Sequence, residues 1–494
     1  MNNEGSSMGL PEPVPEPSRF RNPIGKYRLS RTSACIGCGK CVEICPFGVH
    51  EIKRGRVLTR NHYRCVGLDC PNPCDKECPV NALAVRRNPT FDTIGDFRWT
   101  PDLLASTWTM AETGSVPKTG LEYRIGKSEG GFDKLRLVLP SGSRDSRIED
   151  EIDTGVDLNR RNDHAHKIKI KVPFYGGGMS YGSVSITTML SRIKAATVLG
   201  TFCCTGEGGY PDELKPYDDH VITQVATGLF GVREETIQRV KIVEFKYAQG
   251  AKPGLGGHLL GDKVTPGVAR MREAVVGYPL FSPFPFHSVY SVEDHKKHVD
   301  WIKAINPQAL VSVKVSTPTD VDMVAVGSYY AGAHIIHLDG SYGGTGAAPD
   351  IAKKNIAMPI EYAVPKVHRF LQEEGVRDKI TVIASGGLRT PHDVAKIIAL
   401  GADGVCTGTA DLVALECIRC HNCESGRGCA RGIATTDAEL MNLIDVEWGT
   451  QRISNLFLAW RKELVRILKR LGMKSVRELV GRTDCLVHLD YMKK

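Results

Sequence analysis

The strongest constraint on this chain is the way its cysteines are grouped. Twelve of the sixteen cysteines fall into three short segments of four. Four thiolates within so few residues form a ligand set for iron–sulfur or for zinc, and three such sets in one chain predict electron transfer. The three groups are Cys35, Cys38, Cys41 and Cys45; Cys65, Cys70, Cys74 and Cys78; and Cys417, Cys420, Cys423 and Cys429.

The first two groups have the pattern of a two-cluster ferredoxin. The first has the spacing C-x2-C-x2-C-x3-C-P and ends at Pro46, and the second, with looser early spacing, ends in the same way at Pro79. In such ferredoxins the fourth cysteine of each run binds the other cluster, so we expect Cys45 to serve the second [4Fe–4S] cluster and Cys78 the first. Zinc sites use two separated pairs, and disulfides suit secreted chains that carry an apolar signal segment, which this sequence lacks; both are weaker interpretations.

Length and charge bound the remaining possibilities. The 494 residues suffice for two or three domains, or for one large barrel with attachments. No stretch approaches the roughly 18 apolar residues of a membrane span, and a net charge of +8 is mild for this length. That charge indicates a solvated basic surface or an acidic partner such as a small ferredoxin, and no nucleic-acid binder. Since thiol ligands require a reducing compartment, we expect a soluble cytoplasmic protein with no membrane partner.

Composition divides the chain into five segments. Residues 1–26 are rich in proline and poor in large apolar side chains, which predicts a disordered tail. Residues 27–88 are predicted to form the two-cluster, ferredoxin-like α+β domain, and residues 89–164 a connecting segment to which no chemistry can be assigned. Residues 165–440 have a regular α/β pattern. Residues 441–494 have the leucine spacing of an amphipathic helix and are predicted to form a C-terminal helical extension.

The α/β pattern of the fourth segment predicts a TIM (β/α)8 barrel. Short runs of β-branched or apolar residues alternate with longer helical stretches, and eight such units match a barrel better than an open sheet. The predicted strands are Lys171–Tyr175, Gly200–Cys204, Ile222–Ala226, Val243–Tyr247, Val311–Val315, His334–Leu338, Thr381–Ala384 and Gly404–Thr407. The predicted helices are Val184–Val198, Glu234–Val240, Ser291–Ile305, Asp320–Ala331, Pro359–Glu374 and Pro391–Leu400, the last with Thr390 as its N-cap.

Glycine-rich loops follow several of the predicted strands. Barrel enzymes place their chemistry at the carboxyl ends of the strands and often hold a phosphate after strands seven and eight. Here those two loops read Ser385-Gly386-Gly387 and Thr407-Gly408-Thr409, which allows backbone N–H groups to surround a phosphate. Similar loops follow the first and sixth strands. One phosphate site without a G-x-G-x-x-G fingerprint favours flavin mononucleotide (FMN) over a dinucleotide.

Five motifs at these strand ends, taken in order, resemble the FMN-binding barrel of glutamate synthase. With the ferredoxin-like module in front, the whole chain resembles the short archaeal-type glutamate synthases. The resemblance implies an oxidoreductase acting on CH–NH2 donors, which reduces 2-iminoglutarate, formed from 2-oxoglutarate and ammonia, to L-glutamate by hydride from FMN. The motifs are Met179-Ser180-Tyr181-Gly182-Ser183, Thr205-Gly206-Glu207-Gly208-Gly209, Gln249-Gly250-Ala251-Lys252-Pro253-Gly254, Gly343-Gly344-Thr345-Gly346-Ala347 and Ser385-Gly386-Gly387.

The same resemblance assigns expected roles to individual residues. Lys246 would bind the carboxylate of the oxo acid or polarise its 2-oxo group, Glu207 would manage protons, and Gln249 would face the oxo acid. The expected cofactor-binding residues are Met179, Ser180, Tyr181, Gly182, Thr227, Lys314, Gly343, Gly344, Thr345, Gly386, Gly387, Gly408 and Thr409.

The sequence also departs from the family pattern in places. The third cysteine group offers four cysteines where the longer enzymes use three for a three-iron cluster, so either a [3Fe–4S] or a [4Fe–4S] cluster fits. Leu255 replaces a glutamate, residues 286–288 replace an H-H-D sequence, and Tyr342 replaces an aspartate. These changes are expected near the substrate pocket and leave the acceptor less certain than the flavin.

The resemblance also implies partners. The first cysteine, Cys35, lies inside a cluster motif, so no glutaminase nucleophile is visible, and no NADPH-binding fold is present. Ammonia is therefore expected from a separate glutaminase-like subunit or from solution, electrons from an NADPH reductase or a ferredoxin, and an oligomeric assembly. Two alternatives remain at this stage: a subunit that makes N-methylglutamate, and a flavin and iron–sulfur electron-transfer subunit of a larger complex.

Overall fold

The computed structural model describes residues 9–492 except for residues 141–150, 345, 347, 350 and 354. Eight parallel strands close into a barrel in the order β10, β11, β14, β15, β16, β17, β8 and β9. Each strand lies at one of the eight predicted positions, so the TIM-barrel prediction is confirmed. The strands are β8 (Phe174–Gly176), β9 (Cys203–Cys204), β10 (Val221–Ala226), β11 (Ile242–Lys246), β14 (Leu310–Ser316), β15 (Ile335–Asp339), β16 (Thr381–Ser385) and β17 (Gly404–Thr407).

Helices cover the outside of the barrel, and three of them begin at side-chain caps. The Thr390 hydroxyl accepts a hydrogen bond from the backbone N–H of Asp393, and Pro391 occupies the first turn, as predicted. Ser185 and Ser291 cap two further helices in the same way. The barrel helices are α3 (Ile186–Val198), α4 (Glu234–Arg239), α6 (Val292–Ile305), α7 (Val321–Ala331), α8 (Ile360–Glu373), α9 (Pro391–Ala399) and α10 (Thr409–Ala414).

Short elements close the floor of the barrel and lie around its outside. The strands β6 (Val156–Asp157) and β7 (Lys169–Ile170) pair antiparallel, and Leu158 is buried with them against side chains of the barrel floor. Residues 156–164, which composition grouped with the connecting segment, therefore pack as part of the barrel. The other short elements are α5 (Pro266–Arg272), β12 (His258–Leu259), β13 (Leu280–Phe281), β5 (Leu135–Leu137), β18 (Leu486–His488), α11 (Ala438–Met441) and α13 (Val476–Leu479).

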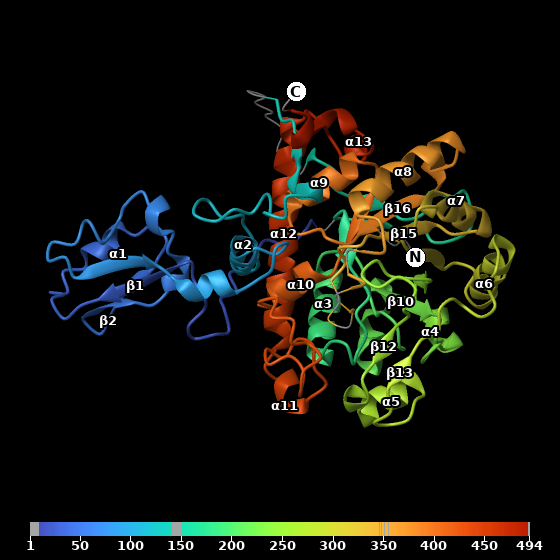
Figure 1. Ribbon diagram of the computed structural model, residues 1–494, viewed down its shortest axis with the longest axis horizontal. Helices are drawn as coiled ribbons and strands as arrows, with labels where there is room; N and C mark the ends of the chain where they lie inside the picture. Colours follow the sequence, from blue (N-terminus) through green and yellow to red (C-terminus); the bar gives the residue numbers. More distant parts are fainter. Residues whose placement is uncertain are drawn as a thin grey trace, which may run out of the picture.

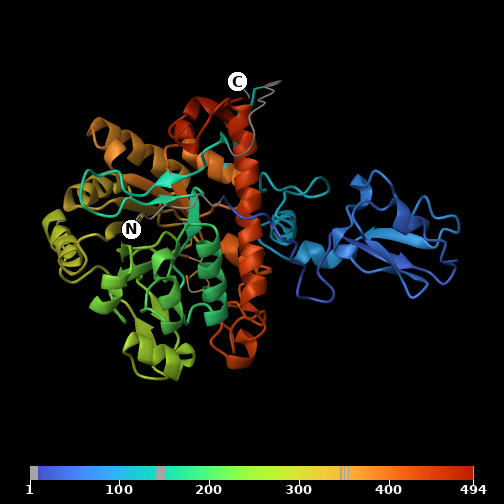
Figure 2. The same cartoon turned by 180° about the vertical axis from the view of Figure 1, so that it is seen from behind.

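The ferredoxin-like module stands to one side of the barrel, beyond the long helix α12 (Figures 1 and 2). Its first and last strands pair antiparallel, and its two middle strands form a hairpin. The helix α1 and the hairpin lie on the side of the module that faces away from the barrel (Figure 1). The elements are β1 (Tyr27–Arg31), α1 (Lys40–Ile44), β2 (His50–Lys53), β3 (Arg56–Thr59) and β4 (Leu83–Arg87).

The connecting segment joins the module to the barrel through α2 (Pro101–Thr113). Near the C-terminal end of this helix, Glu112 forms an ion pair with Arg64 of the module and accepts a hydrogen bond from the Tyr63 hydroxyl. Further along the segment, Asp133 forms an ion pair with Arg389, with a nitrogen-to-oxygen distance of 2.7 Å and both side chains buried. The segment is thus attached both to the module and to the barrel.

The C-terminal segment contains the predicted amphipathic helix as α12 (Val446–Arg470). This helix packs against α3 and α2, and its inner face buries Leu456, Trp460 and Leu464 in the main hydrophobic core. Among the described residues, no helix is long and apolar enough to cross a membrane.

Residues 9–20 differ from the predicted disordered tail. They lie extended near α12, and α12 side chains satisfy their backbone carbonyls: Asn455 donates to Val14, and Arg452 donates to Glu16. The indole N–H of Trp448 likewise donates a hydrogen bond to the carbonyl of Pro17. The segment is too polar to fold alone, but here it is held by partners about 430 residues further along the chain. The first eight residues of the tail lie outside the described part.

The buried ion pair between Asp133 and Arg389 gives a test of this architecture. We expect Asp133→Asn to lower the free energy of unfolding by about 2–4 kcal/mol, because a buried guanidinium would lose one of its two countercharges and keep only Asp393. Burial alone would raise the pKa of Asp133, but Arg389 holds that pKa well below its ordinary value. The contribution should therefore be complete at neutral pH and disappear as the pH falls below about 4.

Denaturant unfolding of the wild type and the variant at pH 7 and at about pH 3 measures this effect. Asp92→Asn is the matched control, because Asp92 forms an exposed ion pair with Arg87 and should change stability little. Equal unfolding curves for wild type and Asp133→Asn at pH 7 would contradict the assignment.

Candidate active site and cysteine cavities

A cavity of about 270 Å³ opens at the carboxyl ends of the barrel strands. Glycine-rich loops form one part of its wall and charged side chains form another, which is the arrangement of a ligand site with few polar anchors. The structure brings most of the predicted site residues together here. Those that line the cavity are Met179, Ser180, Glu207, Lys246, Gln249, Lys314, Gly343, Gly344, Gly386, Gly387, Gly408 and Thr409.

Three predicted residues do not line this cavity in the described structure. Tyr181 packs in two neighbouring apolar clusters, and a Cβ at Gly182 would lie 3.0 Å from the Leu259 side chain. Thr227 lines a smaller adjoining cavity, which also borders Glu207, Lys246 and Gln249. Thr345 lies outside the described residues.

The glycine loops after strands β15 and β16 pack against each other. Gly386 has φ +98°, and a Cβ there would lie 2.5 Å from the carbonyl oxygen of Gly340. A Cβ at Gly387 would lie 2.9 Å from Cβ of Tyr342. Only glycine fits both positions, so the backbone itself forms this part of the wall.

Charged groups gather at the other part of the cavity. Lys246, at the end of β11, lies 3.0 Å from a carboxylate oxygen of Glu207, whose second oxygen is buried without a hydrogen-bond partner. Burial, followed by the charge of Lys246, lowers the pKa of Lys252, and burial lowers that of Arg272 to about 10. Three cations thus share this region with two carboxylates, Glu207 and Glu424. Because Glu424 is already paired with Lys263, positive charge remains in excess, which suits an anionic ligand.

A buried polar network supports the cavity from inside the barrel. Lys314 lies 3.4 Å from Asp339, which accepts a hydrogen bond from Ser385. Ser385 also bonds His337, and His337 lies 3.0 Å from Glu244. Although burial opposes it, the charges of His337 and Lys314 lower the pKa of Glu244 to about 2. The network fixes Lys314 as a cation at the cavity wall.

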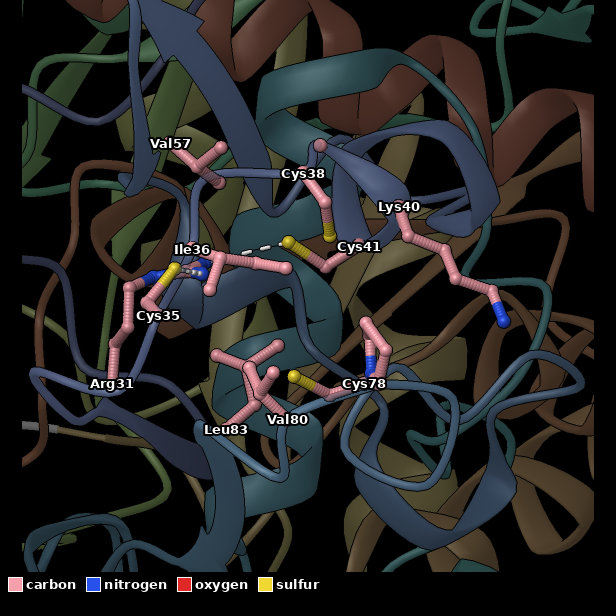
Figure 3. A pocket seen from close by; sticks show the side chains of 12 residues that line it. Arg31, Cys35, Ile36, Cys38, Lys40, Cys41, Val57, Cys78, Val80 and Leu83 are labelled. Atoms are coloured by element: carbon pink, nitrogen blue, oxygen red, sulfur yellow. Dashed lines mark hydrogen bonds between the residues drawn. The ribbon is translucent and has the colours of Figure 1, made fainter.

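The cysteines of the ferredoxin-like module surround two separate cavities. The first is lined by Cys35, Cys38 and Cys41 together with Cys78 (Figure 3). The second is lined by Cys45, Cys65, Cys70 and Cys74. The last cysteine of each run therefore lies beside the first three of the other run.

The surroundings of these thiols suit a bound cluster. Arg31 donates to the sulfurs of Cys35 and Cys41, at 3.2 and 3.4 Å. Burial raises the pKa of Cys65 to about 11 and that of Cys74 to about 12, so both thiols need a nearby metal charge to ionise at neutral pH. Within the described ranges no three His, Cys, Asp or Glu side chains converge on a single-ion site, so the thiols surround a space rather than a point.

The third cysteine group lies at the main cavity. Cys417 and Cys423 line it, and burial raises the pKa of Cys417 to about 11 with Cys423 and Cys429 close by. Arg419 in the same segment forms a 2.9 Å ion pair with Asp96 of the connecting segment. The group therefore faces both the barrel mouth and the segment that leads to the module.

Sequence comparison places these features in one family. The model described as "Conserved region in glutamate synthase" matches residues 132–474, and the "4Fe-4S binding domain" model matches residues 31–49. The chain belongs to the glutamate synthase family.

Among its relatives are proteins of similar length. The chain is 38% identical over 477 residues to the "Archaeal-type glutamate synthase [NADPH]" of Thermotoga maritima, covering 92% of each chain. It is 36% identical over 492 residues to the "Archaeal glutamate synthase [NADPH]" of Methanocaldococcus jannaschii, covering 93% of this chain and 94% of that one. Among solved structures, a flavocytochrome b2 variant with pyruvate bound aligns with a TM-score of 0.46 at 15% identity, over 72% of this chain and 76% of that one.

For this member of the glutamate synthase family, most departures from the family pattern lie outside the main cavity. Leu255 is 53% exposed, and Phe286 packs in the core against Phe245. Only Tyr342 lines the cavity, where the guanidinium of Arg98 lies 3.9 Å from its ring centre. Tyr342 thus lies at the cavity itself, and Leu255 lies between Gly254 and Gly256, which line the adjoining smaller cavity.

Sequence reasoning missed the contribution of the connecting segment to the site. Trp99 lines the main cavity, and Arg98 donates a hydrogen bond to the carbonyl of Gly387. Arg272 was also missed, although it lines the cavity and donates to the Ser180 hydroxyl. The only sequence signal was the pair of large side chains at Phe97 and Trp99 in an otherwise polar stretch.

The crossed arrangement of cysteines predicts how single substitutions group. Cys78→Ser should perturb the same cluster as Cys35→Ser, and Cys45→Ser the same cluster as Cys65→Ser, because serine is a poorer iron ligand. Each variant should lose about four irons per chain. The two variants of a pair should lose the same signal in the electron paramagnetic resonance spectrum of the reduced protein. Cys485→Ser, a buried cysteine outside the three groups, is the control. A Cys45→Ser spectrum that matches Cys35→Ser would overturn the crossing.

Proposed function

We propose that this chain forms L-glutamate by reductive amination of 2-oxoglutarate through 2-iminoglutarate. The observation that carries the proposal is the composition of the main cavity. Glycine loops, a cation cluster and two cysteines of the third group border one space. A planar cofactor, an anionic acid and an electron source can therefore meet there.

The wall of the cavity fits FMN. Gly386, Gly387 and Gly408 present backbone without side-chain obstruction, and Lys314 supplies a fixed positive charge. When bound, the flavin supplies the hydride that reduces the imine carbon. Met179, Ser180, Gly343, Gly344 and Thr409 are the further contacts that we assign to it.

The cation cluster suits a dicarboxylate such as 2-oxoglutarate. Lys246, Lys252 and Arg272 can neutralise its two carboxylates and polarise the 2-oxo group. Glu207 lies 3.0 Å from Lys246 and has one unpaired buried oxygen, so it can accept and return the proton that imine chemistry requires. Gln249 offers an amide for the same ligand.

The cysteine groups are proposed to hold iron–sulfur clusters that supply electrons to the flavin. The two cavities of the module suit two [4Fe–4S] clusters, and the group from Cys417 to Cys429 suits a [3Fe–4S] or a [4Fe–4S] cluster. An NADPH reductase or a ferredoxin would reduce them, and the relatives named above carry NADPH in their names. A separate glutaminase-like subunit would supply ammonia in the cytoplasm, within an oligomer.

The alternative product, N-methylglutamate, would be permitted by the departure from the family pattern at residues 286–288, if these residues lined the cavity. Because Phe286 packs in the core and residues 286–288 do not line the main cavity, the cavity itself favours glutamate. A relay subunit without its own substrate would not need the cluster of Lys246, Lys252 and Arg272 in the cavity wall.

The decisive assay is anaerobic turnover. Reduced protein supplied with 2-oxoglutarate and ammonia should reoxidise its flavin and form glutamate, followed by absorbance and amino-acid analysis. Methylamine in place of ammonia, with N-methylglutamate as the sole product, would identify the alternative. No reoxidation by either mixture would refute both.

Substitution of Lys246 tests the assignment of the substrate end. Lys246→Ala should reduce kcat/KM for 2-oxoglutarate by about 100-fold or more, because an electrostatic contact to the reacting acid is lost. Flavin content should stay unchanged. Lys297→Ala, at a side chain that is 77% exposed, is the control and should keep wild-type turnover. Unchanged kcat/KM in Lys246→Ala would remove this residue from the site.

Substitution of Gly386 tests the flavin end. Gly386→Ala should yield protein with little bound flavin, since the new Cβ collides with the backbone of Gly340. Gly375→Ala separates this collision from backbone strain, because Gly375 also has positive φ but no atom within 4 Å of the added Cβ. Flavin fluorescence after denaturation measures the content. Full flavin occupancy in Gly386→Ala would contradict the assignment of this glycine loop to flavin binding.

A further inference from the structure

The first cysteine cavity reaches the surface on the outer side of the module. Cys38 is exposed, and the apolar side chains of Ile36 and Ile52 beside it are 66% and 59% exposed. Ile52 is next to the cavity, because a Cβ at Gly39 would lie 3.4 Å from its Cδ1. Figure 3 shows Ile36 over the thiols and Lys40 extending away from them. Exposed apolar side chains around a redox site are typical of a protein contact.

The rim of this cavity carries excess positive charge. Lys53 and Arg56 are direct cross-strand partners on the hairpin, and Arg54 lies at its turn. All three are exposed, and no ion pair to them occurs within the described residues. Like charges placed opposite each other repel, so a nearby anionic surface would stabilise this end of the hairpin.

The second cavity has the opposite character. Asp75 lines it, and Asp69 is exposed on the loop that leads to Cys70. An acidic protein is therefore attracted to the first cavity and repelled from the second.

The second cavity also lies closer to the barrel. Val66, which lines it, packs against Gly120 of the connecting segment, and the adjacent Arg64 pairs with Glu112 of α2. Nearer the start of that segment, Gly95 donates to the carbonyl of Ile418, next to Cys417. Contacts thus run from the second cavity toward the third cysteine group, and the first cavity is left at the outer end.

We propose that the face formed by Ile36, Ile52, Lys53, Arg54 and Arg56 docks a small acidic protein that carries one electron at a time. This face is named the hairpin face. The proposal rests on the function proposed above and adds where electrons enter and from what kind of partner. Cys35, Cys38, Cys41 and Cys78 would hold the cluster that accepts one electron from the reduced carrier, and the carrier would thereby be oxidised. Two such transfers, with protons from solvent, supply each reduction of the 2-oxo acid.

Binding of a purified small acidic ferredoxin to the full-length holoprotein tests the proposal directly. The dissociation constant, measured by calorimetry without turnover, should rise steeply with added salt. The double substitution Arg54→Glu and Arg56→Glu should weaken binding at low salt by about tenfold or more. Arg86→Glu is the matched control, an exposed arginine on β4, and should bind as wild type does.

Leu68→Glu distinguishes the two cavities, because Leu68 is 93% exposed beside the second one. Weaker binding in Leu68→Glu with unchanged binding in the double variant would overturn the proposal, as would equal losses in the double variant and Arg86→Glu. Absence of salt-sensitive binding to the wild type would overturn it too. Glutamate formation by wild-type protein reduced with dithionite needs no carrier, so it reports separately on the proposed function.

Discussion

The site depends above all on one buried arginine. Arg389 follows the glycine loop after β16 and is fully enclosed, with bonds to Asp133, to Asp393 and to the carbonyl of Arg98. These bonds fasten the connecting segment to the mouth of the barrel. They are strong because each is charge-assisted and shielded from water. Together with the ion pair between Asp96 and Arg419, they hold Trp99 in the cavity wall.

The same attachment explains how one chain can combine a barrel with a distant redox module. The module touches the body of the protein near Glu112, while Asp96 pairs with Arg419 beside the third cysteine group. A single segment therefore contacts both the module and the cluster segment of the barrel. A change in the position of this segment would therefore alter both contacts at once.

Much of this arrangement could be predicted because the signals are local. The strands and helix caps follow from short patterns, and the crossed pairing of Cys45 and Cys78 follows from the spacing of two adjacent runs. The contacts of Arg98 and Arg389 could not be predicted, because their partners lie more than 250 residues away and no periodicity links them. Residues 9–20 were misjudged for the same reason, since the side chains that hold them belong to α12.

The electrostatics of the substrate end indicate why the acceptor should be a dianion. Lys246, Lys252 and Arg272 lie around Glu207 in a region that is largely closed to water, and the second carboxylate there, Glu424, is neutralised by Lys263. Burial lowers the pKa values of Lys252 and Arg272, so the protein destabilises its own cations there. A ligand with two negative charges would neutralise the excess positive charge of these side chains, whereas a neutral or singly charged acid would leave part of it unpaired. The cavity is therefore selective for ligand charge before any contact with the reacting carbon is made.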